Sequence, residues 1–97
     1  MSTKPVVSLA GDCTLANIRA CHAALAAQSP RLLDLVVDVA GVEQSDISFV
    51  QLIVGASRTA KRHGRIFRLS GASPALVQTF ARAGIGLDPA AGQISHP

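Results

Sequence analysis

The chain has 97 residues, of which 48% are hydrophobic, and nine Lys and Arg against six Asp and Glu give a net charge of +3. This length predicts one domain, residues 1–97, with a modest core of Val, Leu, Ile and Ala, because Trp and Tyr are absent. The charge is too small to indicate a nucleic-acid partner, and no segment approaches the roughly 20 apolar residues of a membrane span. We therefore expect a soluble, cytoplasmic protein that neither binds nucleic acid nor inserts into a membrane.

Strand and helix patterns alternate along the first half of the chain. Residues 5–10 alternate apolar with small or polar side chains, which predicts an edge strand. From Leu15 onward apolar side chains recur every three or four positions, so we expect an amphipathic helix that Thr14 could cap and that ends before Pro30. Residues 32–40 are nearly all apolar and rich in Val, which predicts the central strand, covered on both faces.

The second half repeats this alternation. After a connection over residues 41–47, residues 48–63 show helical spacing and end in cations just before a glycine, as helices often do. Residues 66–70 predict a short third strand. Ser73 followed by proline predicts the cap and first residue of a last helix, which should run to Gly84.

The order strand, helix, strand, helix, strand, helix predicts an α/β domain. Strands that alternate with helices of this length pair in parallel through right-handed crossovers. We expect a mainly parallel sheet of about four strands flanked by helices, formed by residues 5–87. Residues 88–97 contain two Pro, one Gly and two Ala and are expected to form a loose tail.

The sequence lacks the motifs of most enzymes and metal sites. Cys13 and Cys21 are eight positions apart, which fits neither a redox pair nor a zinc pair, so we expect both to be buried as small apolar residues. The three histidines are far apart, and the glycines form neither a phosphate-binding loop nor a dinucleotide-binding motif. No nucleophile elbow is present. We therefore expect no cofactor, no metal and no catalytic activity.

The most informative stretch is E-Q-S-D-I-S-F-V-Q-L, residues 43–52, where the strand pattern gives way to a helix pattern. Asp46 and Ser48 at a helix start can accept hydrogen bonds from the first free N–H groups, and an N-cap is the commoner role of Ser48. Phosphorylation is the alternative for Ser48, and Ser45 is a further candidate. A phosphate on either serine would gain from the helix N-terminus and be repelled by Asp46.

Two large apolar side chains, Ile47 and Phe49, stand in this same stretch. If they do not both turn inward, they form an adhesive patch flanked by Glu43, Asp46 and Gln51, which suits a partner protein better than a small substrate. The alternative is that Phe49 packs under the helix as part of the core, because helical facing is not fixed by one residue.

The chain resembles STAS domains, the family of anti-sigma factor antagonists and related modules. The resemblance covers about residues 5–87. It is best at residues 35–52, with V-V-D-V-A-G-V-E-Q-S-D-I-S-F-V-Q-L, and at residues 64–85, with G-R-I-F-R-L-S-G-A-S-P-A-L-V-Q-T-F-A-R-A-G-I. In the family, a strand ending in Asp-Leu-Ser-Gly-Val is followed by Asp-Ser-Ser-Gly-Leu at the start of a helix.

Three residues match the end of the family's strand: Asp38, Gly41 and Val42. Asp46 matches the Asp that precedes the phosphorylated Ser or Thr, and Ile47 stands at the phosphoacceptor position itself. Ser48 matches the second Ser, and Phe49 replaces the small Gly. Because isoleucine has no hydroxyl, the resemblance implies a STAS domain without the usual phosphorylation switch.

The resemblance implies a bacterial signalling module without enzymatic activity, similar to an anti-sigma factor antagonist, that binds a partner protein. The implied partners are an anti-sigma kinase, a chemotaxis or two-component protein, or the ATPase of a transporter. An accessory subunit of a lipid-transport ABC complex and a nucleotide-binding module are the alternatives. The residues expected to contact the partner are Glu43, Asp46, Ile47, Ser48, Phe49 and Gln51.

Overall fold

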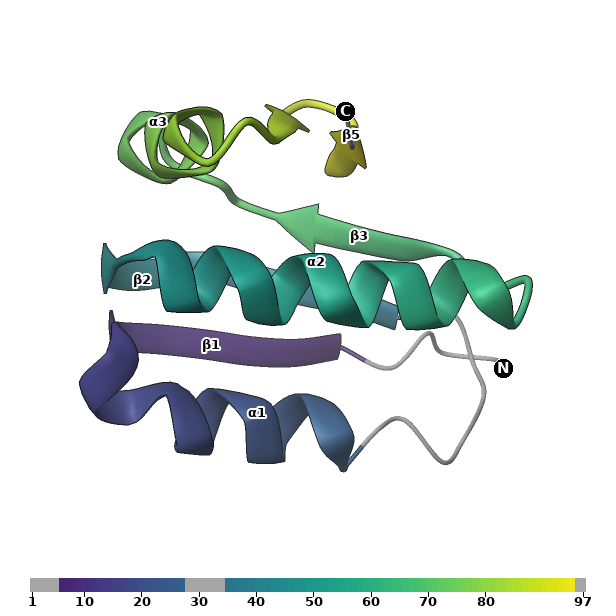
Figure 1. The fold of residues 1–97 in the computed structure, drawn as a ribbon, viewed down its shortest axis with the longest axis horizontal. Coiled ribbons are helices and arrows are strands. Elements are labelled where there is room, and N and C mark those ends of the chain that lie inside the picture. The colour runs from purple at the N-terminus through teal and green to yellow at the C-terminus, as the bar shows by residue number, and fades with distance from the viewer. Residues whose placement is uncertain (1–5, 28–34, 96–97) are drawn as a thin grey trace.

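Three parallel strands form the main sheet of this protein in the order β1-β2-β3, as seen in a computed structural model that describes residues 6–27 and 35–95 (Figure 1). The elements follow one another as β1 (Val6–Cys13), the 3-10 helix η1 (Leu15–Asn17), α1 (Ile18–Ala26), β2 (Leu35–Ser45), α2 (Ile47–Arg62), β3 (Phe67–Ser70), α3 (Pro74–Arg82), β4 (Gly86–Asp88) and β5 (Gln93–Ser95). The predicted α/β alternation, the edge position of the first strand and the central position of the second are confirmed.

The main sheet has three strands, whereas about four were expected. Three strands are parallel, while β4 and β5 form a separate antiparallel pair. The expected loose tail is therefore wrong for residues 88–95. The backbone N–H of Leu69 in β3 donates to the carbonyl oxygen of Gly92 at 2.9 Å, which ties the turn between β4 and β5 to the main sheet. The remaining residues of the tail, 96 and 97, lie outside the described part of the chain.

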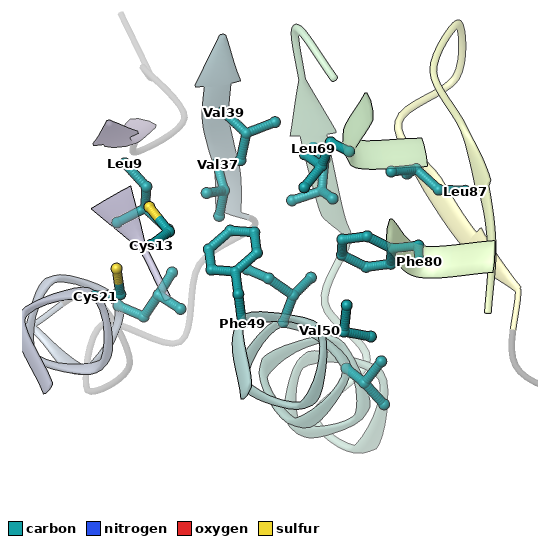
Figure 2. Packing of buried hydrophobic residues seen from close by; sticks show 14 of the residues in the cluster. Leu9, Cys13, Cys21, Val37, Val39, Phe49, Val50, Leu69, Phe80 and Leu87 are labelled. Atoms are coloured by element: carbon teal, nitrogen blue, oxygen red, sulfur yellow. The ribbon is translucent and has the colours of Figure 1, made fainter. Parts of the chain in front are cut away.

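Burial alternates along the strands, which shows that the helices cover one face of the sheet. Val37 and Val39 in β2 are buried, whereas the alternate residues Val36 and Asp38 are half-buried. α2 runs lengthwise in front of β2, and its buried side chains meet those of the strands (Figures 1 and 2). The prediction that the central strand is covered on both faces was wrong, because a continuous run of valines hid the alternation.

β2 is longer than predicted because it continues through two irregularities. Its pairing with β1 shifts by one residue between Ser8 and Ala10 and again between Gly11 and Asp12, which leaves an extra residue in β2 each time. Bulges of this kind bend a strand and interrupt the inward and outward alternation of its side chains. Residues 41–45 therefore lack a strand pattern in the sequence, yet they pair with β1 as far as Ser45.

The start of the first helical region also differs from the prediction. Thr14 makes no side-chain capping bond to the turn that follows, and Leu15 begins a 3-10 helix, in which side chains repeat every three residues. As a result Leu15 points to solvent with 70% of its surface exposed, while Cys21 and Leu25 of α1 are buried.

The core lies between the sheet and the three helices. Phe49 of α2 and Phe80 of α3 meet edge to face, with ring centroids 6.5 Å apart, beneath the inward valines and leucines of the strands (Figure 2). Cys13 of β1 and Cys21 of α1 are both buried and free, as the sequence predicted, and lie next to each other in this layer (Figure 2). Ser73 caps α3 by accepting from the N–H of Leu76, as predicted.

Candidate partner-binding site at the strand-to-helix junctions

Asp46 caps the longest helix of the domain. Its extended backbone places the carboxylate over the first turn of α2, where one oxygen, Oδ1, accepts from the backbone N–H groups of Ser48 at 3.0 Å and Phe49 at 3.3 Å. The Ser48 hydroxyl donates to the same oxygen. The capping role predicted for Asp46 is thus confirmed, and that predicted for Ser48 is wrong, because Ser48 already lies within the helix.

The second oxygen of Asp46 reaches across to the other strand-to-helix junction. It accepts from the backbone N–H of Leu15 at 2.9 Å, at the start of η1. Asp12 has a local version of the same role, since its carboxylate accepts from the backbone N–H of Thr14 at 2.9 Å and from the Thr14 hydroxyl. The Asp46 carboxylate therefore links the carboxyl ends of β1 and β2, and the Asp12 carboxylate orders the turn directly after β1.

These hydrogen bonds stabilise the charged form of both acids. The Ser48 hydroxyl, followed by the backbone N–H of Leu15, lowers the pKa of Asp46 below its ordinary value. The hydroxyl and backbone N–H of Thr14 lower the pKa of Asp12 in the same way. Both groups therefore stay ionised at neutral pH and serve as structural anions, not as proton donors.

Two large apolar side chains are exposed beside this link. Ile47, the first residue of α2, has 57% of its surface exposed, and Leu15 has 70%. Asp46, which precedes Ile47 and is bonded to the N–H of Leu15, is partly exposed, and Gln51 follows one turn after Ile47 on the helix surface. We call Leu15, Asp46, Ile47 and Gln51 the junction patch. Leu15 was not predicted to be exposed, because its spacing matches the apolar stripe of the following helix.

The other expected contact residues lie in different surroundings. Phe49 is completely buried against Phe80, so it belongs to the core and not to the surface, and its expected contact with a partner is corrected on this ground. Ser48 is half-buried, with its hydroxyl turned to Asp46. Glu43 is exposed and is the extra residue at the second irregularity of β2, before the junction.

A hollow of about 340 Å³ adjoins the junction patch on the side of α3. Its lining is formed by Ser45, Asp46, Ile47, Thr79, Arg82 and Ala83. The Ser45 hydroxyl is half-buried here and donates to the Thr79 hydroxyl at 3.4 Å. The sequence did not predict that Thr79 and Arg82 line this site, because nothing in their helical spacing indicates that α3 lies beside the start of α2.

Within residues 6–27 and 35–95, no group of three or more His, Cys, Asp or Glu side chains is placed to hold a metal ion. In the same ranges, no helix combines the length and apolar character needed to cross a membrane.

Residues 2–87 match the family model described as "Mlab, STAS domain". The match spans the three parallel strands and all three helices, and it includes both strand-to-helix junctions. No curated protein sequence matches the chain significantly.

Proposed function

This chain belongs to the STAS domain family, and on that premise we propose that it is a regulatory module that binds a partner protein through the junction patch. The observation that carries the proposal is the exposure of Leu15, whose backbone N–H binds the Asp46 carboxylate, and of Ile47, the residue directly after Asp46. Large apolar side chains gathered at the surface mark interaction sites more often than they serve a folded monomer.

The junction patch also has the rigidity that a docking surface needs. Its backbone is fixed by the hydrogen bonds that Asp46 accepts from Leu15 and Ser48, and Phe49, two positions after Ile47, anchors the helix in the core. A pre-ordered surface loses little conformational entropy when it binds. STAS domains are generally regulatory modules without enzymatic activity, and this arrangement suits that role.

We propose that this module works without the usual phosphorylation switch. Ile47 has no hydroxyl to accept a phosphate at the position that the resemblance assigns. A phosphate on Ser48 would replace a donated hydrogen bond to Asp46 with repulsion between two anions, and so would loosen the cap of α2. Ser45 is half-buried and bonded to Thr79, so its modification requires that contact to break first.

The partner is a bacterial signalling protein or a transporter ATPase in this proposal. An anti-sigma kinase and a chemotaxis or two-component protein are the signalling candidates. An accessory subunit of a lipid-transport ABC complex is the second candidate function. The description of the matched family favours it, since that description carries the name Mlab and not that of an anti-sigma factor antagonist.

The proposal is tested by replacing the apolar side chains of the junction patch. The wild-type protein is used to capture its partner from cells that express it, the partner is identified by mass spectrometry, and the affinity of the purified pair is measured. We expect Leu15→Ser and Ile47→Ser each to weaken binding about tenfold, because each removes a buried apolar contact from the complex. Unchanged affinity in both variants would place the interface elsewhere.

Ile66→Ser is the matched control, because Ile66 is also exposed, at 46%, but follows α2 at its far end. It should bind the partner as the wild type does. Calorimetry with ATP and GTP addresses the nucleotide-binding alternative, for which the hollow beside Arg82 is the place to look. Micromolar binding of either nucleotide would contradict a function that depends on protein contacts alone.

A further inference from the structure

A second hollow lies at the far end of α2, away from the junction patch. It has a volume of about 290 Å³ and is formed where the end of α2, the start of β3 and β5 meet. Its lining includes Lys61, Arg65, Ile66, Phe67, Gln93 and Ile94. We propose that this hollow binds a small organic anion, in which one carboxylate or phosphate group is joined to an apolar body.

The charge of the hollow points to an anion. Lys61 and Arg65 both contribute to its wall, and none of the described residues that line it is acidic. The Nε atom of Arg65 is buried, and no hydrogen-bond partner for it is present in the part of the chain that the structure describes. A guanidinium group that is partly removed from water without an acceptor is costly, and an anion at its exposed edge would compensate that cost through charge-assisted hydrogen bonds.

Stabilisation of the C-terminal end of α2 explains the positive charge of Lys61 but not that of Arg65. Lys61 lies in the last turn, where a cation compensates the negative end of the helix dipole. Arg65 comes after the helix, and its backbone N–H donates to the Ala60 carbonyl at 2.8 Å. The N–H of Gly64 likewise donates to the Lys61 carbonyl at 3.0 Å. With these carbonyls occupied, the charge of Arg65 is not needed to satisfy the helix end.

The rest of the wall suits an apolar body attached to the anion. Phe67 and Ile94 are partly buried hydrophobic residues that pack against the core, and their remaining surface faces the hollow. The volume is at the lower end of the range for small-molecule pockets. A single anionic group at Lys61 and Arg65, with a short aliphatic chain on Phe67 and Ile94, satisfies both halves of the site.

The test is a titration of nitrogen-15-labelled protein followed by NMR, with octanoate and hexyl phosphate as probes and octanol as the neutral control. We expect a saturable shift of the Arg65 Nε–H signal and of the backbone amides of Phe67 and Ile94 with either or both anions. Octanoate and hexyl phosphate distinguish a carboxylate from a phosphate ligand. No saturable shift with either anion, or equal binding of octanol, would overturn the proposal.

Variants separate this site from general attraction to a basic surface. Arg65→Gln and Lys61→Gln should each weaken anion binding about tenfold, which is the loss expected for one charge-assisted hydrogen bond. Arg58→Gln removes the same charge from an exposed position of α2 outside the hollow and should bind as the wild type does. An equal loss in all three variants would show that only net charge matters and would refute a defined site.

Discussion

The carboxylate of Asp46 accepts a hydrogen bond from the backbone N–H of Leu15 at 2.9 Å, although these residues are 31 positions apart in the chain. The same carboxylate caps α2 through its other oxygen. One side chain therefore fixes the starts of η1 and α2 relative to each other. This link makes Asp46 a structural residue of the junction patch, whatever contact it also makes with a partner.

Replacing Asp46 should accordingly lower the stability of the domain. Asp46→Ala loses the acceptors for Leu15, Ser48 and Phe49 together. Asp46→Asn keeps one carbonyl oxygen, so its stability should lie between those of Asp46→Ala and the wild type. We expect a lower urea midpoint with an unchanged slope, because the surface exposed on unfolding stays the same. Glu43→Ala, which removes an exposed carboxylate nearby, is the control and should leave the midpoint unchanged.

Acid should destabilise the domain through the same carboxylates. The pKa values of Asp46 and Asp12 are lowered in the folded state, so both groups bind protons more readily when the chain is unfolded. Their contribution to stability is complete above the unfolded pKa of about 3.9 and is lost as the pH falls through the lower folded values. Urea midpoints measured from pH 6 down to pH 2 should decline mainly below about pH 4, and the decline should be smaller in Asp46→Asn.

Phe49 is expected to be essential for folding and not directly for partner contact. Its side chain is completely buried and meets Phe80 edge to face, so Phe49→Ala should destabilise the domain by about 3–5 kcal/mol. Ile47→Ala, two positions earlier and exposed, should change stability by less than about 0.5 kcal/mol. Equal urea midpoints for these two variants would contradict the burial that separates them.

The sequence predicted those parts of the fold that depend on regular spacing. The alternation of strands and helices, the central strand and the capping roles of Asp46 and Ser73 follow from periodicity and from residue types that prefer such places. The large apolar side chain of Ile47 in a polar stretch pointed to a partner surface, and the family resemblance supplied the regulatory function class.

Features that depend on contacts between distant segments could not be predicted from residue spacing. The exposure of Leu15 follows from a 3-10 turn, which interrupts the helical spacing that the sequence displays. Residues 41–45 pair with β1 despite two register shifts, and the hairpin of β4 and β5 is held by Leu69 of β3. In each of these segments tertiary hydrogen bonds determine the structure, and local propensity is too weak to show it.

The two cysteines should be nearly inert in the folded protein. Burial, with a further contribution from neighbouring Cys21, raises the pKa of the Cys13 thiol to about 12, so almost no reactive thiolate is present at neutral pH. We expect very slow reaction with a thiol reagent at pH 8 and fast reaction of both thiols in denaturing urea. Rapid modification of the native protein at pH 8 would contradict this packing.

Gly92 should tolerate no side chain, because the turn between β4 and β5 is packed directly on β3. Its φ of +71° is a left-handed conformation, and an added Cβ would overlap the carbonyl oxygen of Leu69. Gly92→Ala should therefore destabilise the domain by at least about 1–2 kcal/mol, through the cost of left-handed alanine together with this overlap.

Gly55→Ala is the matched control, since Gly55 lies within α2 and an added Cβ there meets nothing within 4 Å. It should stabilise the helix by about 1 kcal/mol. An unchanged or raised urea midpoint for Gly92→Ala would contradict the packing of this turn on Leu69.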